Sequence, residues 1–150
     1  TQSLIQYTTV RIWYIIVMRL MGIDYGTKRV GIALSDDKGL MAFPYSVIGS
    51  DKTLIKEIET IVQKEKVGKI VIGHSLNKSG EANTVQGAIE ALMLDITLNL
   101  GLPVELEPER YTTQEAKRLQ GKNSMTDASA ATIILNSYIA RNQHLKAKNA

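Results

Sequence analysis

Three acidic residues stand where a carboxylate is chemically informative: Asp24, Glu109 and Asp127. Asp24 ends an apolar segment that we predict to be a core strand, where an uncompensated acid is costly. Glu109 follows the last predicted strand, and Asp127 lies in the first turn of the last predicted helix. Mg²⁺ and Mn²⁺ prefer oxygen ligands, and two such ions can activate water for phosphodiester cleavage. The three acids therefore predict a divalent-metal site, provided that the fold brings them together.

Each acid also has a purely structural interpretation. Asp24 can be an exposed acid at a hairpin turn, and Glu109 can pair with Arg110 or Lys117 on the surface. Asp127 can cap its helix and interact favourably with the helix dipole. These alternatives remain open at the level of the sequence.

The chain contains two histidines and no cysteine, which argues against a zinc site built from these residues. His144 lies in a polar segment where solvent is expected to surround it. His74 follows a predicted buried strand, where it either lines the cleft or is a satisfied loop residue. The lack of cysteine excludes disulfides and fits a reducing cytoplasm.

The elements that must position the acids follow from apolar periodicity and turn residues. Segments near residues 20–24, 30–35 and 41–48, joined by turns at Gly26 and at residues 36–39, predict an antiparallel meander. The glycine is expected at Gly26 because it reaches backbone angles that a Cβ forbids. The elements predicted after the meander are a helix capped by Asp51, a buried strand at 69–73, a helix at 84–100 stopped by Gly101 and Pro103, a strand at 104–106, a short helix from Thr113 and a helix at 127–141. This order predicts a mixed sheet with helices on its faces.

The last predicted helix offers a route for Asp127 to the strand ends. Ala130, Ala131, Ile134 and Tyr138 lie on the same helical face as Asp127 and are small or apolar. We expect this face to pack on the sheet, because small alanines permit a close approach.

The segment 22–36, GIDYGTKRVGIALSD, resembles the opening of the YqgF/RuvX family of RNase H-like proteins. The resemblance continues in the same order through three further motifs: IG at 72–73 with LNKSGE at 76–81, ERYTTQEA at 109–116, and DASAATIILNSY at 127–138. Together these motifs cover about residues 18–140. The resemblance implies an RNase H-like α/β fold, with an antiparallel three-strand meander plus parallel strands flanked by helices.

The resemblance also implies a function. It points to a metal-dependent nuclease that processes the 5′ end of pre-16S ribosomal RNA, or alternatively to a Holliday junction resolvase that acts on four-way DNA. The partner would be structured RNA or branched DNA rather than a membrane, the cofactor Mg²⁺ or Mn²⁺, and the protein a cytoplasmic monomer or homodimer.

Residue by residue, Asp24, Glu109 and Asp127 match the metal-binding acids of that family. Asp24 would bridge the ions, Glu109 would help to orient the attacking water, and Asp127 would complete the coordination. The basic residues expected to hold nucleic-acid phosphates are Lys28, Arg29, Arg110 and Lys122.

The resemblance has departures that bear on function. The chain reads Gly73-His74-Ser75 where the family has a Gly-Leu-Pro loop, and Pro108 stands where the family has an acid. The segment at 119–126 is short and keeps only Lys122 of the expected basic residues. These departures leave a non-catalytic ribosome-assembly or nucleic-acid-binding protein as a second alternative. The segment GIDYGT also resembles the phosphate loop of actin-like ATPases and sugar kinases, which need two such domains, whereas 150 residues suit one.

The predicted domain boundaries follow the motifs. We expect an extension outside the main fold at 1–17, with an added edge strand as the alternative, then a nuclease domain at 18–141 and a polar tail at 142–150. The apolar run at 12–17 is shorter than the ~20 residues of a membrane helix. Removal of residues 1–17 is expected to change the thermal midpoint little. The net charge of +3 permits contact with phosphates without demanding it.

Overall fold

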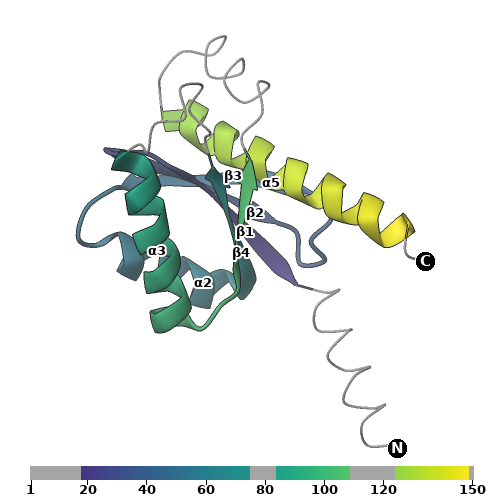
Figure 1. The fold of residues 1–150 in the computed structure, drawn as a ribbon, viewed down its shortest axis with the longest axis horizontal. Helices are drawn as coiled ribbons and strands as arrows, with labels where there is room; N and C mark the ends of the chain where they lie inside the picture. The colour runs from purple at the N-terminus through teal and green to yellow at the C-terminus, as the bar shows by residue number, and fades with distance from the viewer. Residues whose placement is uncertain (1–17, 75–83, 109–123, 149–150) are drawn as a thin grey trace, which may run out of the picture.

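The computed structural model of the chain describes residues 18–74, 84–108 and 124–148. Their elements, in chain order, are β1 (Arg19–Tyr25), β2 (Arg29–Ser35), β3 (Ala42–Gly49), α2 (Leu54–Glu65), β4 (Val67–His74), α3 (Thr84–Leu100), β5 (Val104–Pro108) and α5 (Ser124–Lys148). Figure 1 shows α5 across one face of the sheet and α2 and α3 against the other. None of these described helices is long and apolar enough to cross a membrane.

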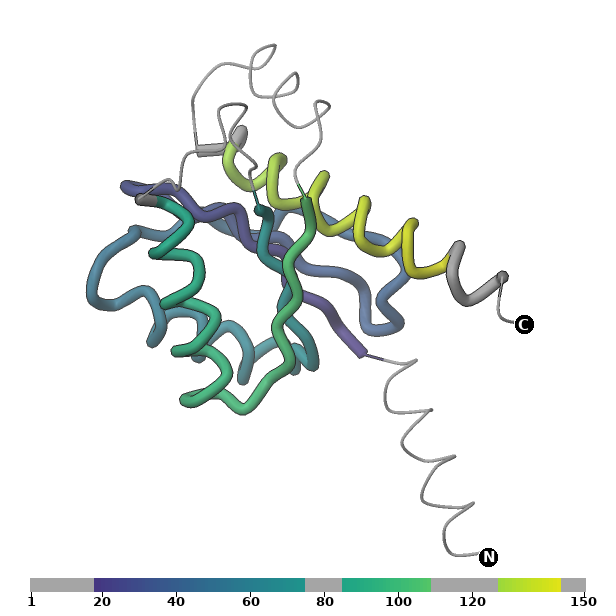
Figure 2. Tube along the Cα trace, viewed as in Figure 1, coloured from purple at the N-terminus to yellow at the C-terminus, as the bar shows by residue number. Residues whose placement is uncertain are grey.

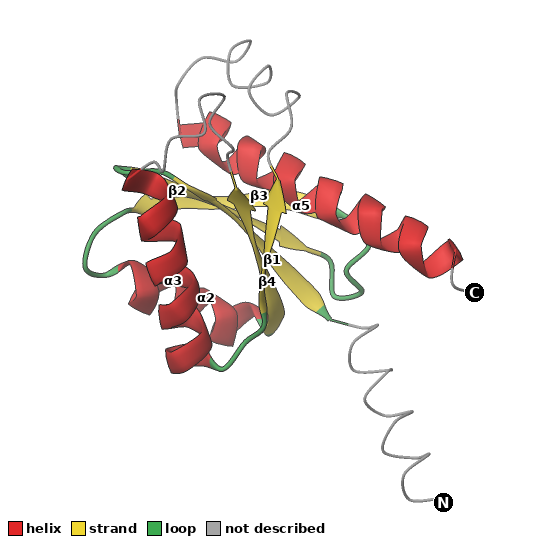
Figure 3. Ribbon diagram, viewed as in Figure 1, coloured by secondary structure: helices red, strands yellow, loops and turns green. Residues whose placement is uncertain are grey.

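The strands form one sheet in the order β3-β2-β1-β4-β5. The first three strands pair antiparallel, whereas β4 runs parallel to both β1 and β5. The predicted mixed sheet, a three-strand meander plus parallel strands flanked by helices, is therefore confirmed (Figure 3). Because β1 is the central strand, Asp24 at its carboxyl end lies next to the carboxyl end of β4.

The side chains of the central strands alternate between two apolar layers. Ile23, Ile32 and Ile72 are fully buried in the layer that α2 and α3 cover. Val71 points to the other face and packs with Leu135 in the layer beneath α5. The strand that we predicted at 69–73 is thus buried on both faces, as its continuous apolar run indicated.

The predicted cap of α2 is wrong by two residues. α2 begins at Leu54 with Thr53 as its N-cap residue, and the Thr53 side chain makes no capping hydrogen bond. Asp51 instead closes the turn before the helix, where its Oδ1 accepts the Thr53 N–H at 2.8 Å. Hydrogen bonds from the side chain and backbone of Thr53 hold the pKa of Asp51 below its ordinary value. The carboxylate therefore stabilises the approach to the helix rather than its first turn.

α5 is longer than predicted at both ends. It runs for 25 residues, whereas we predicted a helix at 127–141 followed by a polar tail at 142–150. The chain contains neither glycine nor proline between Ser124 and Lys148, so no residue in this span ends the helix. The segment predicted to be a tail is therefore helical as far as Lys148.

Candidate active site

Asp24 lies at the carboxyl end of β1 and points to the face that α5 covers. Its side chain is buried, with 5% of its surface exposed. A Cβ on Gly22, two residues earlier on the same face, would lie 2.8 Å from Leu135 Cβ and 2.9 Å from the Ala131 carbonyl oxygen of α5. Since residues two apart in a strand share a face, Asp24 also faces α5, nearer to its N-terminus.

Gly31 connects this acid to the start of α5. It is the register partner of Asp24 across the β1–β2 pair, so their Cα–Cβ directions share one face. A Cβ on Gly31 would lie 2.1 Å from the Asp127 carbonyl oxygen and 2.5 Å from its carbonyl carbon. The backbone of Asp127 therefore packs directly against β2, next to Asp24. The structure brings these two predicted site acids to the same corner of the sheet.

The side chain of Asp127 forms an ion pair with Arg29 at this corner. Arg29 Nε lies 3.2 Å from Asp127 Oδ2, which is an ion-pair distance. The same Oδ2 is buried and accepts no hydrogen bond, so the Arg29 N–H is not aimed at it. A buried carboxylate oxygen is unfavourable unless a cation compensates its charge, and in this structure Arg29 is that cation. This oxygen therefore lacks a hydrogen-bond donor but not a counter-charge, and the role of Asp127 as a metal ligand stays a prediction.

The turn between β1 and β2 carries the basic residues predicted to hold phosphates. The Lys28 side chain is exposed, and the Lys28 carbonyl accepts the Ser50 N–H at 3.1 Å, which braces the turn against the end of β3. Arg29 is half exposed beside Asp127. The reason we gave for Gly26 is wrong, because among the described glycines only Gly39 and Gly101 have a positive φ. A Cβ on Gly26 would instead lie 2.5 Å from the Arg29 carbonyl oxygen, so close packing requires the glycine.

Glu109, Arg110 and Lys122 lie outside the described residues. Pro108, the residue before Glu109, pairs with His74 at the end of β4, on the edge of the sheet that carries Asp24. Among the described residues alone, no three His, Asp or Glu side chains come together as metal ligands. The predicted three-acid site is thus represented by Asp24 and Asp127, and the place of Glu109 in it stays a prediction.

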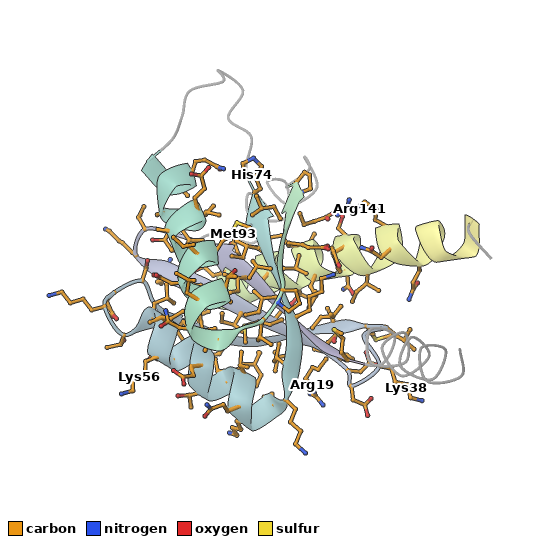
Figure 4. The ribbon with its side chains drawn as sticks, turned by 60° about the horizontal axis from the view of Figure 1, so that its bottom comes forward. Arg19, Lys38, Lys56, His74, Met93 and Arg141 are labelled. Carbon is orange, nitrogen blue, oxygen red and sulfur yellow. The ribbon has the colours of Figure 1, made fainter. Side chains whose placement is uncertain are left out.

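His74 does not point toward the two acids. Along β4, Ile70 and Ile72 face α2 and α3, so His74 falls on that face as well. Figure 4 shows His74 at the end of β4, near the start of α3. Its Nδ1 is buried without a hydrogen-bond partner. The interpretation in which His74 lines a cleft shared with Asp24 is therefore not supported.

A buried acid that the sequence did not reveal lies two residues before Glu109. Glu107 on β5 is 1% exposed and forms an ion pair with Arg141 of α5. Its Oε1 also accepts a hydrogen bond from Ser137 Oγ at 3.1 Å. Because both of its oxygens are engaged, we interpret Glu107 as a structural link between β5 and α5. Arg141 is labelled on α5 in Figure 4.

A second polar link joins the same two layers. Lys69 Nζ donates to Glu105 Oε1 at 3.0 Å and lies 5.3 Å from the ring centre of Tyr138. Burial opposes the charge on Lys69, but hydrogen bonds to Tyr138 and Glu105 outweigh it and raise the pKa of Lys69. Lys69 and Tyr138 also line a cavity of about 520 Å³, together with Met18 and Asn142. The cavity contains neither Asp24 nor Asp127, so we do not assign the proposed chemistry to it.

Comparison with known proteins supports a nuclease lineage. The family model RuvX, described as Holliday junction resolvase, matches residues 18–141. A protein of Maridesulfovibrio salexigens named "Putative pre-16S rRNA nuclease" is 35% identical over 136 residues, which cover 83% of this chain and 99% of that protein. A protein of the same name from Pelotomaculum thermopropionicum is 35% identical, over 81% of this chain and 86% of its own length.

Solved structures share the fold at low sequence identity. RuvC of Thermus thermophilus in complex with a Holliday junction substrate superimposes with a TM-score of 0.57 at 12% identity, over 84% of this chain and 96% of that chain. The fowlpox virus resolvase with Holliday junction DNA gives a TM-score of 0.52 at 12% identity, over 83% and 98%. Since the family model spans residues 18–141 and the curated relatives match over four fifths of the sequence, the chain belongs to the RuvX family.

Proposed function

We propose that this protein is a phosphodiester-cleaving nuclease that works with a divalent metal ion. The observation that carries the proposal is the corner at which Asp24 and Asp127 meet beneath the start of α5, where Asp127 Oδ2 pairs with Arg29 but accepts no hydrogen bond. Two carboxylates on one face, one with a buried oxygen that lacks a donor, form a donor set suited to a hard cation. The relatives named as nucleases agree with this chemistry.

The residues present fit Mg²⁺ or Mn²⁺. Asp24 and Asp127 would hold the ion, and Glu109 is proposed as the third carboxylate. When bound, the ion lowers the pKa of water and neutralises charge on the scissile phosphate. Glu109 is proposed to orient the water whose oxygen bonds to phosphorus, while the bond from phosphorus to the leaving oxygen breaks.

The basic residues near the acids are proposed to bind the phosphates of the substrate. Lys28 on the exposed turn and Arg29 beside Asp127 are proposed to contact phosphates on the two sides of the scissile bond, together with Arg110 and Lys122. Phosphate contacts fix register without reading sequence, so this set suits recognition of a folded nucleic acid by its shape. Arg29 is half exposed, which leaves its guanidinium able to turn from Asp127 to a phosphate.

The preferred substrate is precursor 16S ribosomal RNA, because the curated relatives carry that name, and we propose its 5′ end as the place of cleavage. The second candidate is a four-way DNA junction, which the family description and the fold shared with junction-bound RuvC favour. We propose a cytoplasmic location, which suits either substrate.

The test is cleavage by purified protein with Mn²⁺ or Mg²⁺. An RNA that spans the mature 5′ end and a four-way DNA junction are offered separately, and the ends of the products are sequenced. Asp24→Asn and Asp127→Asn should each abolish cleavage and weaken Mn²⁺ binding while the fold is retained, because asparagine keeps the shape and capping ability but not the charge. Glu57→Gln, on the exposed side of α2, is the matched control. Equal cleavage by wild type and both site variants would refute the proposal, and a wild type that cuts neither substrate would favour the non-catalytic alternative.

A further inference from the structure

α3 carries an apolar stripe on the side turned away from the sheet. The residues that face the core are Ile89, Leu92 and Ile96. The opposite side is formed by four exposed residues, which we call the α3 seam: Gly87, Ala91, Leu94 and Leu98. Leu94 keeps 59% of its surface exposed and Leu98 keeps 73%.

The spacing of the α3 seam is that of a helix-pairing surface. Its members are separated by four, three and four residues, which is the spacing of the a and d positions of a coiled coil. The charged residues of α3, Glu90 and Asp95, both lie outside the seam. A single exposed leucine is normal in a soluble protein, but an uncharged stripe with this period is typical of a helix that packs against another helix.

We infer that the α3 seam binds the α3 seam of a second copy of this chain, antiparallel and about a two-fold axis. With the axis between Leu92 and Met93, Leu98 falls opposite Gly87 of the second copy, and Leu94 falls opposite Ala91 of the second copy. Each contact occurs twice, as in any two-fold interface. Large side chains therefore meet small ones at every level of the seam. This size match identifies a second copy as the partner.

Gly87 supports the same pairing. Glycine is a poor helix former, and the φ of Gly87 is not positive. A Cβ built on Gly87 meets nothing within 4 Å. The described part of the monomer therefore gives no packing or backbone reason for glycine at this position. In the antiparallel pair, Gly87 leaves the space that the Leu98 side chain of the second copy fills.

The flanking charges are compatible with self-association. In the antiparallel register, Glu90 is level with Asp95 of the second copy, but the two lie on opposite flanks of the seam. On its own flank, Glu90 lies nearest to Thr97 of the second copy, and Asp95 lies nearest to Ala88 of the second copy. The acids therefore do not face one another across the interface, which would be unfavourable.

The size of the seam sets the expected strength of the dimer. α3 has 17 residues and is about 25 Å long. One helix pair of this length is smaller than the ~800 Å² per partner of a standard stable interface, so we expect a dimer that forms on the order of micromolar concentration. α5 lies on the other face of the sheet, so both acid corners stay accessible in the dimer (Figure 1).

The first test is sedimentation equilibrium of the full chain over a concentration range that brackets the micromolar scale. The wild type should show a monomer–dimer equilibrium, and Leu98→Lys and Gly87→Leu should remain monomeric. Leu40→Lys is the matched control, because Leu40 is 57% exposed on the β2–β3 turn and lies outside the seam. A wild type that is monomeric throughout, or a dimer that Leu98→Lys leaves intact, would overturn the inference.

The second test addresses the register. Combining Gly87→Leu with Leu98→Ala exchanges the large and small positions and should restore the dimer that Gly87→Leu alone loses. The chain has no cysteine, so an Ala91→Cys variant mixed with a Leu94→Cys variant should give a disulfide heterodimer in excess over either homodimer. Equal yields of the three species would reject the antiparallel register. Circular dichroism checks that each variant is folded. Because none of these measurements depends on cleavage, a failure of the dimer can be told apart from a failure of the proposed nuclease function.

Discussion

Replacement of Gly31 by alanine tests whether the approach of α5 to β2 creates the proposed site. The added Cβ would lie 2.1 Å from the Asp127 carbonyl oxygen and 3.1 Å from the Ala128 nitrogen. Both are backbone atoms of a helix, so they cannot move aside as a flexible side chain does. Ordinary contact begins at 3.4 Å, and the start of α5 must therefore retreat by about 1.3 Å.

The expected effect on activity is larger than the effect on stability. Overpacking of this kind costs about 1–3 kcal/mol, which lowers the thermal midpoint by several degrees in a domain of this size. A displacement of ~1 Å between reacting groups can cost on the order of a hundred-fold in rate. We therefore expect Gly31→Ala to remain folded at room temperature, to bind Mn²⁺ more weakly and to cleave about a hundred-fold more slowly.

Gly22→Ala is the matched control for this experiment. Its Cβ also meets α5, at 2.8 Å from Leu135 Cβ and 2.9 Å from the Ala131 carbonyl oxygen, which lie about two helical turns and one helical turn from Asp127. It should therefore lower stability while disturbing the acid corner less. Thermal unfolding, calorimetric titration with Mn²⁺ and cleavage rates of both variants separate the two effects. A Gly31→Ala variant with wild-type metal affinity and rate would refute the reasoning.

Three further predictions follow from contacts around the site. Arg29→Met should tighten Mn²⁺ binding in a calorimetric titration, because the cation 3.2 Å from Asp127 Oδ2 is gone; unchanged affinity would contradict this. Arg141→Met should lower the free energy of unfolding in denaturant by about 3 kcal/mol, because Glu107 stays buried and loses its cation. A variant that also carries Glu107→Leu should recover most of that loss. Burial opposes the charge on Glu105, but hydrogen bonds from Tyr138 and Lys69 outweigh it and hold the pKa of Glu105 below its ordinary value of 4.5. The ionised Glu105 side chain therefore contributes to the free energy of unfolding above pH 4.5, and this contribution is lost as the pH falls through the lowered pKa. The Glu105→Gln variant should lose less stability than the wild type on acidification, as measured by denaturant unfolding at a series of pH values. An identical loss of stability in both proteins below pH 4.5 would argue against this.

Local sequence signals predicted most of the fold. The helix predicted at 84–100 is observed at Thr84–Leu100, because Gly101 takes a positive φ of 65° and ends it. The strands predicted at 20–24 and 30–35 are each found within one residue of those bounds. In these segments the periodicity and the end signals agree, so the local pattern is sufficient.

Long-range contacts explain what the sequence did not reveal. In the sequence, Glu107 is simply one polar residue in a short strand. Its burial depends on Ser137 and Arg141, which lie about thirty residues further along the chain. Gly31 offered a usable signal, because glycine inside a strand often marks a close backbone approach. Which backbone approaches it depends on how α5 lies across the sheet, and the periodicity of α5 alone does not specify that.

The order of the elements also determines when the proposed activity can begin. Asp24 belongs to the first strand and Asp127 to the last helix, as the colour gradient along the trace in Figure 2 makes visible. At roughly 5–20 residues per second, several seconds of synthesis separate the two carboxylates. The β1–β2–β3 meander can pair during that interval, but the acid corner is incomplete until α5 docks. A prematurely terminated chain can therefore retain part of the sheet but lacks the complete acid corner, and we expect such a fragment to have no cleavage activity.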